Sequence, residues 1–170
     1  MCIRDRALGD LEQAKEYQQR GLAIFLKKLG AEHVSVATSY VNLASIHKAL
    51  GDLKQAKEYQ KRGLAIFLKK LGAEHVSVAT SYGNLASIHK ALGDLEQAKE
   101  YQQRGLAIQL KKLGAEHVSV ATSYGNLASI HQDLGDLEQA KENQQRALAI
   151  KSKKLGAEYV SVTTRYCTII

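Results

Sequence analysis

Histidine is the residue type with the widest chemical range in this sequence, and six histidines recur in pairs: His33 and His47, His75 and His89, His117 and His131. A metal or acid–base site needs such side chains to converge on one point. The members of each pair are 14 residues apart with a predicted helix between them, so the spacing assembles no ligand set. We expect no metal site. The second histidine of each pair shares an apolar helix face with Tyr40, Tyr82 or Tyr124, and we expect both residue types to be core residues.

Hydroxyl and thiol side chains give no indication of nucleophilic catalysis. No serine lies in a nucleophile-elbow sequence, and no glycine-rich phosphate loop follows a strand, because the sequence predicts no strands. Cys2 and Cys167 stand at opposite ends of the chain, in contexts that would not activate a thiol. They make no disulfide framework, which favours a reducing, cytoplasmic compartment. We therefore expect no enzyme activity and no cofactor.

Amide, hydroxyl and charged side chains form a third group, which recurs along one side of three predicted helices. We name these residues the polar stripe: Thr38, Asn42, Ser45 and Lys48; Thr80, Asn84, Ser87 and Lys90; Thr122, Asn126, Ser129, Gln132 and Asp133. A solvated helix face is the simplest interpretation of such a pattern. What else the stripe does depends on the elements that position it.

The stripe recurs because the chain repeats itself with a period of 42 residues. The copies are residues 9–50, 51–92, 93–134 and a partial fourth at 135–166. We assign one repeat array to residues 7–166, because residues 1–6 and 167–170 match the repeat nowhere. The array is expected to be a fragment of a longer solenoid that starts with an unpaired second helix and stops inside a first one.

Each copy contains two helical patterns. Over Val34–Leu50, with about 100° of rotation per residue, apolar residues gather on one side and the polar stripe on the other. Gly51 ends this helix, and Asp52 with Gln55 has the pattern of an N-terminal cap for a second helix, Leu53–Leu71. The linkers are short, so neighbouring helices must pack antiparallel. The sequence predicts an all-α solenoid of helix pairs.

These residues resemble a known family. Asn42-Leu43-Ala44, Gly51-Asp52-Leu53 and Arg62-Gly63-Leu64-Ala65-Ile66 are similar to the tetratricopeptide repeat, and the 42-residue period with its Leu-Gly-x-x-His linker resembles the kinesin light chain and nephrocystin types. The resemblance implies a right-handed superhelix.

The sequence departs from the family pattern at two positions of the repeat. Val34, Val76, Val118 and Val160 stand where the family usually has Pro, which sets the start of each first helix less rigidly. A glycine inside the second helix, at 21, 63 and 105, replaces the usual Ala at a cost of about 1 kcal/mol per helix, and only Ala147 restores it.

In the resembled family the polar stripe lines a concave groove that binds extended peptides. Stacked repeats bring equal positions side by side, so Asn42, Asn84 and Asn126 should form a ladder. An amide suits a peptide backbone because it donates and accepts at once. The resemblance thus implies a non-enzymatic interaction scaffold, for instance a cargo or signalling adaptor, whose partners are linear segments of other proteins.

Differences among the copies and the distribution of charge bear on the ligand. The three complete first helices differ at three positions that we expect on the groove side: Val41/Gly83/Gly125, Lys48/Lys90/Gln132 and Ala49/Ala91/Asp133. Both a specialised ligand surface and neutral drift explain such differences. The net charge is +7, most of it on second helices, where it is expected to form a solvated face. Lys48 and Lys90 beside the asparagines favour an acidic peptide.

Composition leaves two alternatives to a peptide scaffold. The 170 residues are 45% apolar, which suits a folded core, and no apolar run approaches the roughly 20 residues of a membrane span, so no membrane partner is expected. A basic array that binds nucleic acid is one alternative, but no aromatic side chains alternate with the lysines as stacking platforms. A structural spacer within a longer protein is the other.

Overall fold

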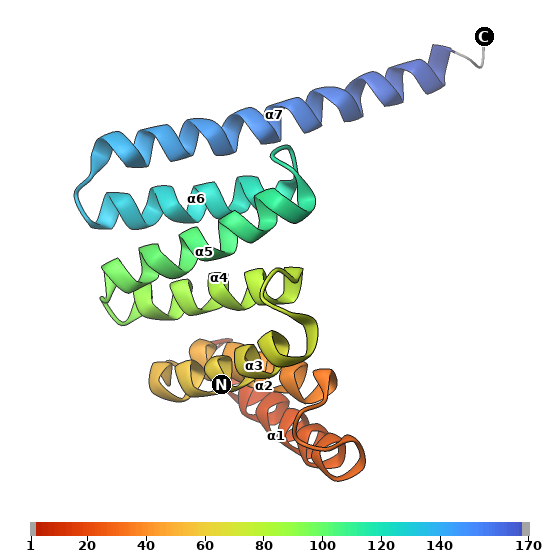
Figure 1. Cartoon of the computed structure of the whole chain (residues 1–170), viewed down its shortest axis with the longest axis vertical. Coiled ribbons are helices and arrows are strands. Elements are labelled where there is room, and N and C mark those ends of the chain that lie inside the picture. The colour runs from red at the N-terminus through yellow and green to blue at the C-terminus, as the bar shows by residue number, and fades with distance from the viewer. Residues whose placement is uncertain (1–2, 168–170) are drawn as a thin grey trace. The chain divides into compact units, whose positions relative to one another are not determined.

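The computed structural model describes the backbone of residues 3–167 and the side chains of residues 9–153, so Cys2 and residues 168–170 lie outside the described residues. The described backbone is helical throughout, with short linkers (Figure 1). Its helices are α1 (Ile3–Leu29), α2 (Val34–Ala49), α3 (Leu53–Leu71), α4 (Val76–Ala91), α5 (Leu95–Leu113), α6 (Val118–Asp133) and α7 (Leu137–Cys167). Among the described residues, no helix is long and apolar enough to cross a membrane.

The chain forms two compact units, residues 1–108 and residues 109–170. In the first unit α2 packs against both α1 and α3, and α3 packs against α4; in the second unit α6 packs against α7. Consecutive helices within each unit run antiparallel (Figure 1). The expected fold class, an α-solenoid of antiparallel helix pairs, is confirmed.

Helix α2 is buried on two sides. Val36 and Leu43 of α2 share a core cluster with Leu22 of α1. Ala37, one residue further on, lies in the cluster of Leu64 and Phe67 from α3. A helix that is sandwiched in this way leaves only one narrow side to solvent, and the polar stripe occupies that side.

Glycines end the helices at the positions that the sequence predicts. Gly72 has φ 83° and ψ 161°, a conformation that a residue with a Cβ rarely adopts, and its N–H donates to the Leu68 carbonyl at 3.2 Å. Gly51, with φ 85°, separates α2 from α3. These linkers fold each pair back on itself.

The sequence predicts that the glycines inside the second helices only cost stability, but the surroundings of two of them show that they also have a packing role. A Cβ on Gly63 would lie 3.0 Å from the Ala37 carbonyl oxygen and 3.0 Å from Val41 Cγ2. A Cβ on Gly105 would lie 2.9 Å from the Ala79 carbonyl oxygen. The absent side chain therefore lets the first helix approach the second closely. Gly21 differs, because a Cβ there would have no atom within 4 Å.

The expected break in the fourth copy is wrong. Helix α7 continues through Gly156 to Cys167, where the sequence predicts a linker and the start of a new first helix at Val160. This linker differs from the earlier ones at one residue. Each earlier first helix begins after a histidine whose Nδ1 accepts the N–H of the serine two positions on, at 3.1 Å. The fourth copy has Tyr159 there, and a tyrosine has no acceptor so close to its backbone.

Helix α1 at the other end is also longer than its equivalents. Helix α1 runs through Gly9 and Asp10, although the equivalent pair, Gly51 and Asp52, separates α2 from α3. Later copies hold that turn with a histidine, His47 in the first complete copy, and the corresponding position here is Asp5. Residues 1–6 match the repeat nowhere, so the sequence that precedes this turn in later copies is absent here.

Candidate functional site

A cleft of about 340 Å³ lies between the exposed sides of α2 and α4, in the first unit. It is lined by Ala44, Ser45, Lys48, Ala49, Gln60, Asn84, Ser87 and Ile88. Four members of the polar stripe, namely Ser45, Lys48, Asn84 and Ser87, are among these residues. Small apolar side chains and one amide from α3 supply the rest of the lining.

Hydrogen bonds fix part of the stripe in place. Lys48 Nζ donates to Ser87 Oγ and so connects the two helices that border the cleft. Thr38 and Thr80 each donate their hydroxyl to the carbonyl four residues earlier, at 3.1 Å. Ser45 does the same at 3.2 Å. These hydroxyl hydrogens are used within the helices, while the oxygens keep acceptor capacity.

The amides that the sequence singles out differ in burial. Asn42 is exposed on α2, and Asn84 is half-buried at the cleft. Both lie in the first unit, on successive first helices. Asn126 is exposed on α6 in the second unit. Lys90 is half-buried on α4.

Gln60 is a cleft residue that the helix pattern does not predict. It belongs to α3, is 1% exposed, and its Nε2 donates to the Ser81 carbonyl oxygen at 3.4 Å. A buried amide at the base of a cleft offers polar chemistry where the pattern indicates only core. One feature of the sequence could have identified this residue: a glutamine recurs at the equivalent position of every second helix, on the same face as Ala56 and Gly63.

The second unit has a cleft of its own, of about 280 Å³, between α6 and α7. It is lined by Gly125, Ala128, Ser129, Gln132, Ala140, Lys141 and Gln144. Ser129 and Gln132 are stripe residues, whereas Thr122 and Asp133 are exposed elsewhere on α6. Thr122 donates its hydroxyl to the Val118 carbonyl at 3.0 Å.

One of the positions that differ among copies does not face the cleft. Val41 packs into the core cluster with α3, where its Cγ2 lies 3.0 Å from the position of a Cβ on Gly63. Gly83, its equivalent, has Gln102 Oε1 of α5 as the nearest atom, 3.9 Å from a Cβ built there. The expectation that this position lines the groove is therefore wrong for Val41, whereas the equivalent Gly125 does line the cleft of the second unit. A helical wheel shows how residues are distributed around one helix, but it does not show which neighbouring helix covers each side.

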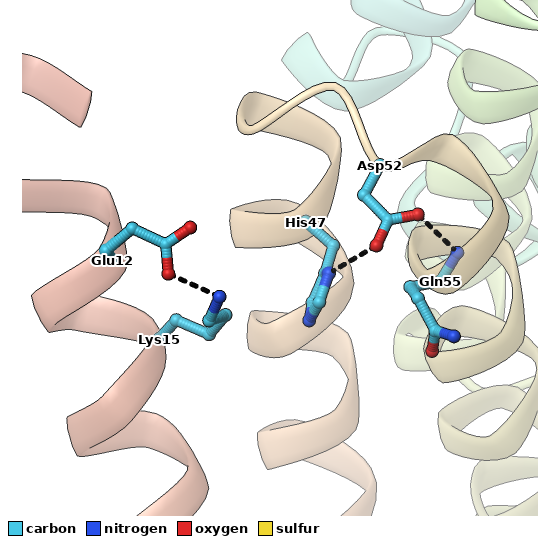
Figure 2. Close-up of polar contacts among 5 residues, drawn as sticks. All are labelled: Glu12, Lys15, His47, Asp52 and Gln55. Carbon is cyan, nitrogen blue, oxygen red and sulfur yellow. Dashed lines mark hydrogen bonds and ion pairs between the residues drawn. The ribbon is translucent and has the colours of Figure 1, made fainter. Parts of the chain in front are cut away.

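The histidines prove to be structural. His47, His89 and His131 are buried, as expected for core residues. The Nδ1 atom of His47 lies 3.2 Å from Asp52 Oδ2, while Asp52 Oδ1 accepts the N–H of Gln55 at 3.2 Å, the predicted cap (Figure 2). The same histidine contact measures 2.9 Å at Asp94. Within the described part of the chain, no group of His, Cys, Asp and Glu is arranged to hold a metal ion.

Aromatic packing around these histidines differs between the units. In the first unit Tyr59 stacks on Tyr40 with a centroid distance of 6.0 Å and lies 5.2 Å from the His47 ring. The tyrosines at 40, 82 and 124 are half-buried, so they sit at the edge of the core. In the second unit Asn143 replaces the partner tyrosine, and the Arg146 guanidinium lies 5.6 Å from the centre of the Tyr124 ring.

Charged side chains away from the clefts form ion pairs at the linkers. Glu32, in the linker before α2, pairs with Lys69 and Lys70 of α3. The hydrogen bond and the charge of Lys69 lower the pKa of the Glu32 carboxyl below its ordinary value. Lys153 pairs with Glu116 at 3.0 Å in the second unit. These lysines do not line the two clefts that contain polar-stripe residues, in agreement with their expected place on a solvated face.

Comparison with solved structures finds the same architecture in other proteins. BtubC (BKLC) from P. vanneervenii matches with a TM-score of 0.80 and 27% identity over 87% of this chain, which spans 59% of that protein. A kinesin light chain-like protein of Podosopora anserina with nearly identical TPR-like repeats matches with a TM-score of 0.71 and 34% identity, over 88% of this chain and 71% of that one. No curated protein sequence matches the chain.

The repeat period, the helix pairs and the turn residues all have counterparts in one family. The sequence model of the tetratricopeptide repeat matches residues 5–69 and 77–153, which is most of the chain. Proteins of this kind are generally scaffolds for protein–protein interaction and are typically not enzymes. The chain belongs to the tetratricopeptide repeat family, and its solved neighbours include kinesin light chain-like members.

Proposed function

We propose that the chain is a non-enzymatic scaffold that binds an extended peptide of another protein along the polar stripe. The observation that supports this most directly is the cleft between α2 and α4, because four stripe residues from two copies line it together. The first-helix side of the second unit would contribute Thr122, Asn126, Ser129, Gln132 and Asp133 to the same function.

The cleft has the chemistry that an extended peptide needs. Ala44, Ala49 and Ile88 offer apolar contact, while the amides of Asn84 and Gln60 offer donors and acceptors. The ammonium group of Lys48 lies at the rim, bound to a neutral hydroxyl that a carboxylate can replace. We therefore propose an acidic peptide, held mainly by the first two copies, and an adaptor role for cargo or signalling proteins.

A displayed library of random peptides tests the proposal and selects the ligand sequence at the same time. Peptides of about 12 residues, which extend to roughly 40 Å, are selected on the full chain, and their affinities are measured by fluorescence anisotropy. The variant Asn42→Ala/Asn84→Ala/Asn126→Ala should lose about 0.5 to 1.5 kcal/mol per hydrogen bond removed. Its matched control, Gln19→Ala/Gln103→Ala, removes exposed amides from second helices and should bind like the parent.

Two charge-reversal variants distinguish binding in the groove from attraction by the net charge of the chain. Lys48→Glu/Lys90→Glu should weaken selected acidic peptides more than Lys54→Glu/Lys61→Glu, which makes the same charge change on the exposed surface of α3. Equal losses in the two variants would mean that only net charge matters. If the library yields no specific binder, the spacer alternative gains. If an oligonucleotide binds with a steep loss of affinity in salt, the nucleic-acid alternative gains.

A further inference from the structure

The cleft between α2 and α4 has a buried amide at its base. Gln60 of α3 lines the cleft but is only 1% exposed, so it lies below exposed stripe residues such as Ser45 and Lys48. Its Nε2 donates to the Ser81 carbonyl oxygen at 3.4 Å. This bond also determines which way round the amide is, because only the NH₂ group can face a carbonyl oxygen. The Oε1 atom therefore lies on the other side of the amide group.

The Oε1 atom of Gln60 has no donor within the described part of the chain. Among the described residues, the side-chain atoms that are fully covered and still unpartnered are ring nitrogens of His47, His89 and His131. Gln60 Oε1 is not one of them, so it keeps some contact with solvent, and the cavity that Gln60 lines is the cleft. A molecule that fills the cleft and excludes water must donate a hydrogen bond to this oxygen, or leave it unpaired at a cost.

The rest of the cleft restricts the group that can donate to Gln60. Lys48 places an ammonium group at the rim, which repels a cationic side chain such as lysine or arginine. A carboxylate has no hydrogen to donate and would bring negative charge against the Oε1 atom. A backbone N–H stays with the peptide chain, which in the proposed complex runs along the stripe at the rim. The donor must therefore be neutral and stand at the end of a side chain.

A carboxamide meets these conditions. Its NH₂ group can donate to Gln60 Oε1 while its oxygen accepts from the amide of Asn84, which is half-buried in the same cleft. An indole donates but has no acceptor, and a phenol must use one oxygen for both contacts. Ala44 and Ile88 provide apolar walls for the methylene groups of a glutamine, and about 340 Å³ leaves room for them.

We propose that the cleft binds a glutamine side chain of the peptide, and that Gln60 is the residue that selects it. The inference rests on the proposed peptide function and deepens it. Acidic residues of the peptide pair with Lys48 at the rim, and the glutamine between them enters the cleft. The selectivity lies in one oxygen atom, because a ligand side chain without a donor covers Gln60 Oε1 and leaves it unpaired.

Selections from the random peptide library test this assignment. On the parent chain, glutamine should be enriched at one fixed position among acidic residues. The enrichment should disappear in selections on Gln60→Met, a variant of similar shape that has no amide. It should persist on Gln55→Met, the matched control on the exposed surface of the same helix. Circular dichroism checks that Gln60→Met is folded, since it also loses the hydrogen bond to Ser81.

Substitutions in a selected peptide need no change in the protein. Replacing the enriched glutamine by glutamate or leucine should raise the Kd for the parent chain by about 5- to 150-fold, the cost of a buried oxygen without a donor. The leucine change should have a much smaller effect on Gln60→Met, because no oxygen is then left unpaired. If Gln60→Met does not fold, the enrichment and the two peptide changes on the parent chain decide the question.

The outcomes separate this inference from the function on which it rests. Specific binders without glutamine enrichment would overturn the inference and leave the peptide scaffold standing. Enrichment of tyrosine or tryptophan would do the same and assign the cleft to an aromatic side chain. Equal losses for the leucine peptide on the parent and on Gln60→Met would remove Gln60 as the selecting residue. A library without any specific binder would overturn both proposals.

Discussion

Exchanging glycine for alanine at equivalent positions of the second helices tests the close packing of the helix pairs. Alanine gains about 1 kcal/mol of helix propensity over glycine wherever its methyl group has room. Gly21→Ala has that room, because no atom lies within 4 Å of the new Cβ. We expect this variant to be more stable than the parent by about 0.5 to 1 kcal/mol.

Gly105→Ala should behave in the opposite way. Its Cβ would lie 2.9 Å from the Ala79 carbonyl oxygen, a backbone atom that moves only with its helix. Forcing an extra methyl group into a packed contact costs about 1 to 3 kcal/mol, which equals or exceeds the propensity gain. The two variants should therefore differ by about 1 to 3 kcal/mol, or several degrees in melting temperature. The reverse change, Ala147→Gly, should destabilise, since Ala147 is buried and loses both its propensity and its methyl contacts.

Thermal and urea unfolding of the dilute chain, followed by circular dichroism, measure these differences. Gly63→Ala should fall between the other two, because its Cβ would lie 3.0 Å from the Ala37 carbonyl oxygen. If Gly105→Ala stabilises the chain as much as Gly21→Ala, the helices do not depend on the missing side chain. The glycines would then be the simple propensity cost that the sequence predicts.

Four further predictions follow from other contacts. His117→Ala should lower stability by about 0.5 to 2 kcal/mol in urea unfolding, because His117 Nδ1 accepts the Ser119 N–H at the start of α6. Gln109→Phe combined with Ser123→Ala should raise the stability of the second unit by about 0.5 to 2 kcal/mol: burying Phe gains about 1.5 to 3 kcal/mol, and the hydrogen bond from Ser123 to Gln109, worth about 1 kcal/mol, is lost together with both of its partners. Glu32→Gln should lower the melting temperature slightly at neutral pH but not in acid. The lowered pKa of the Glu32 carboxyl means that its ionised form stabilises the fold; this contribution is fully present above the ordinary carboxyl pKa and is lost as the pH falls through the lowered pKa. Amide hydrogen exchange should be fastest before about Leu29 and after about Val160, since terminal repeats have fewer neighbours, and uniform protection along the chain would contradict the nearest-neighbour picture.

The sequence is sufficient for the fold because the repeat presents the same evidence several times. Each copy shows an amphipathic pattern, a glycine stop and an aspartate cap, so one helix pair can be read from Val34 to Leu71 and then checked against the others. The periodicity of the sequence does not show how closely two helices approach each other. For that reason the sequence indicates only a cost at Gly63, although in the structure this glycine allows a close crossing.

The candidate site is predictable only in part, for a similar reason. The exposed side of a first helix follows from its wheel, and Ser45 and Lys48 do line the cleft with Asn84 and Ser87. Gln60 is not predictable in this way, because it reaches the cleft from α3, and the helical wheel of a first helix contains no residue of the second helix. The turns illustrate the same limit, since the role of His33 as a cap depends on the geometry of one side-chain nitrogen.

The link between histidine and helix breaks has a consequence at the level of the gene. Codons for histidine differ from those for tyrosine by a single nucleotide, and tyrosine is the residue at 159, where α7 continues past the expected linker. A single-base change at codon 159 would therefore give this linker the sequence that precedes α2, α4 and α6. In a gene that duplicates this unit, the sequence of such a linker can be gained or lost by base substitution, without insertion or deletion.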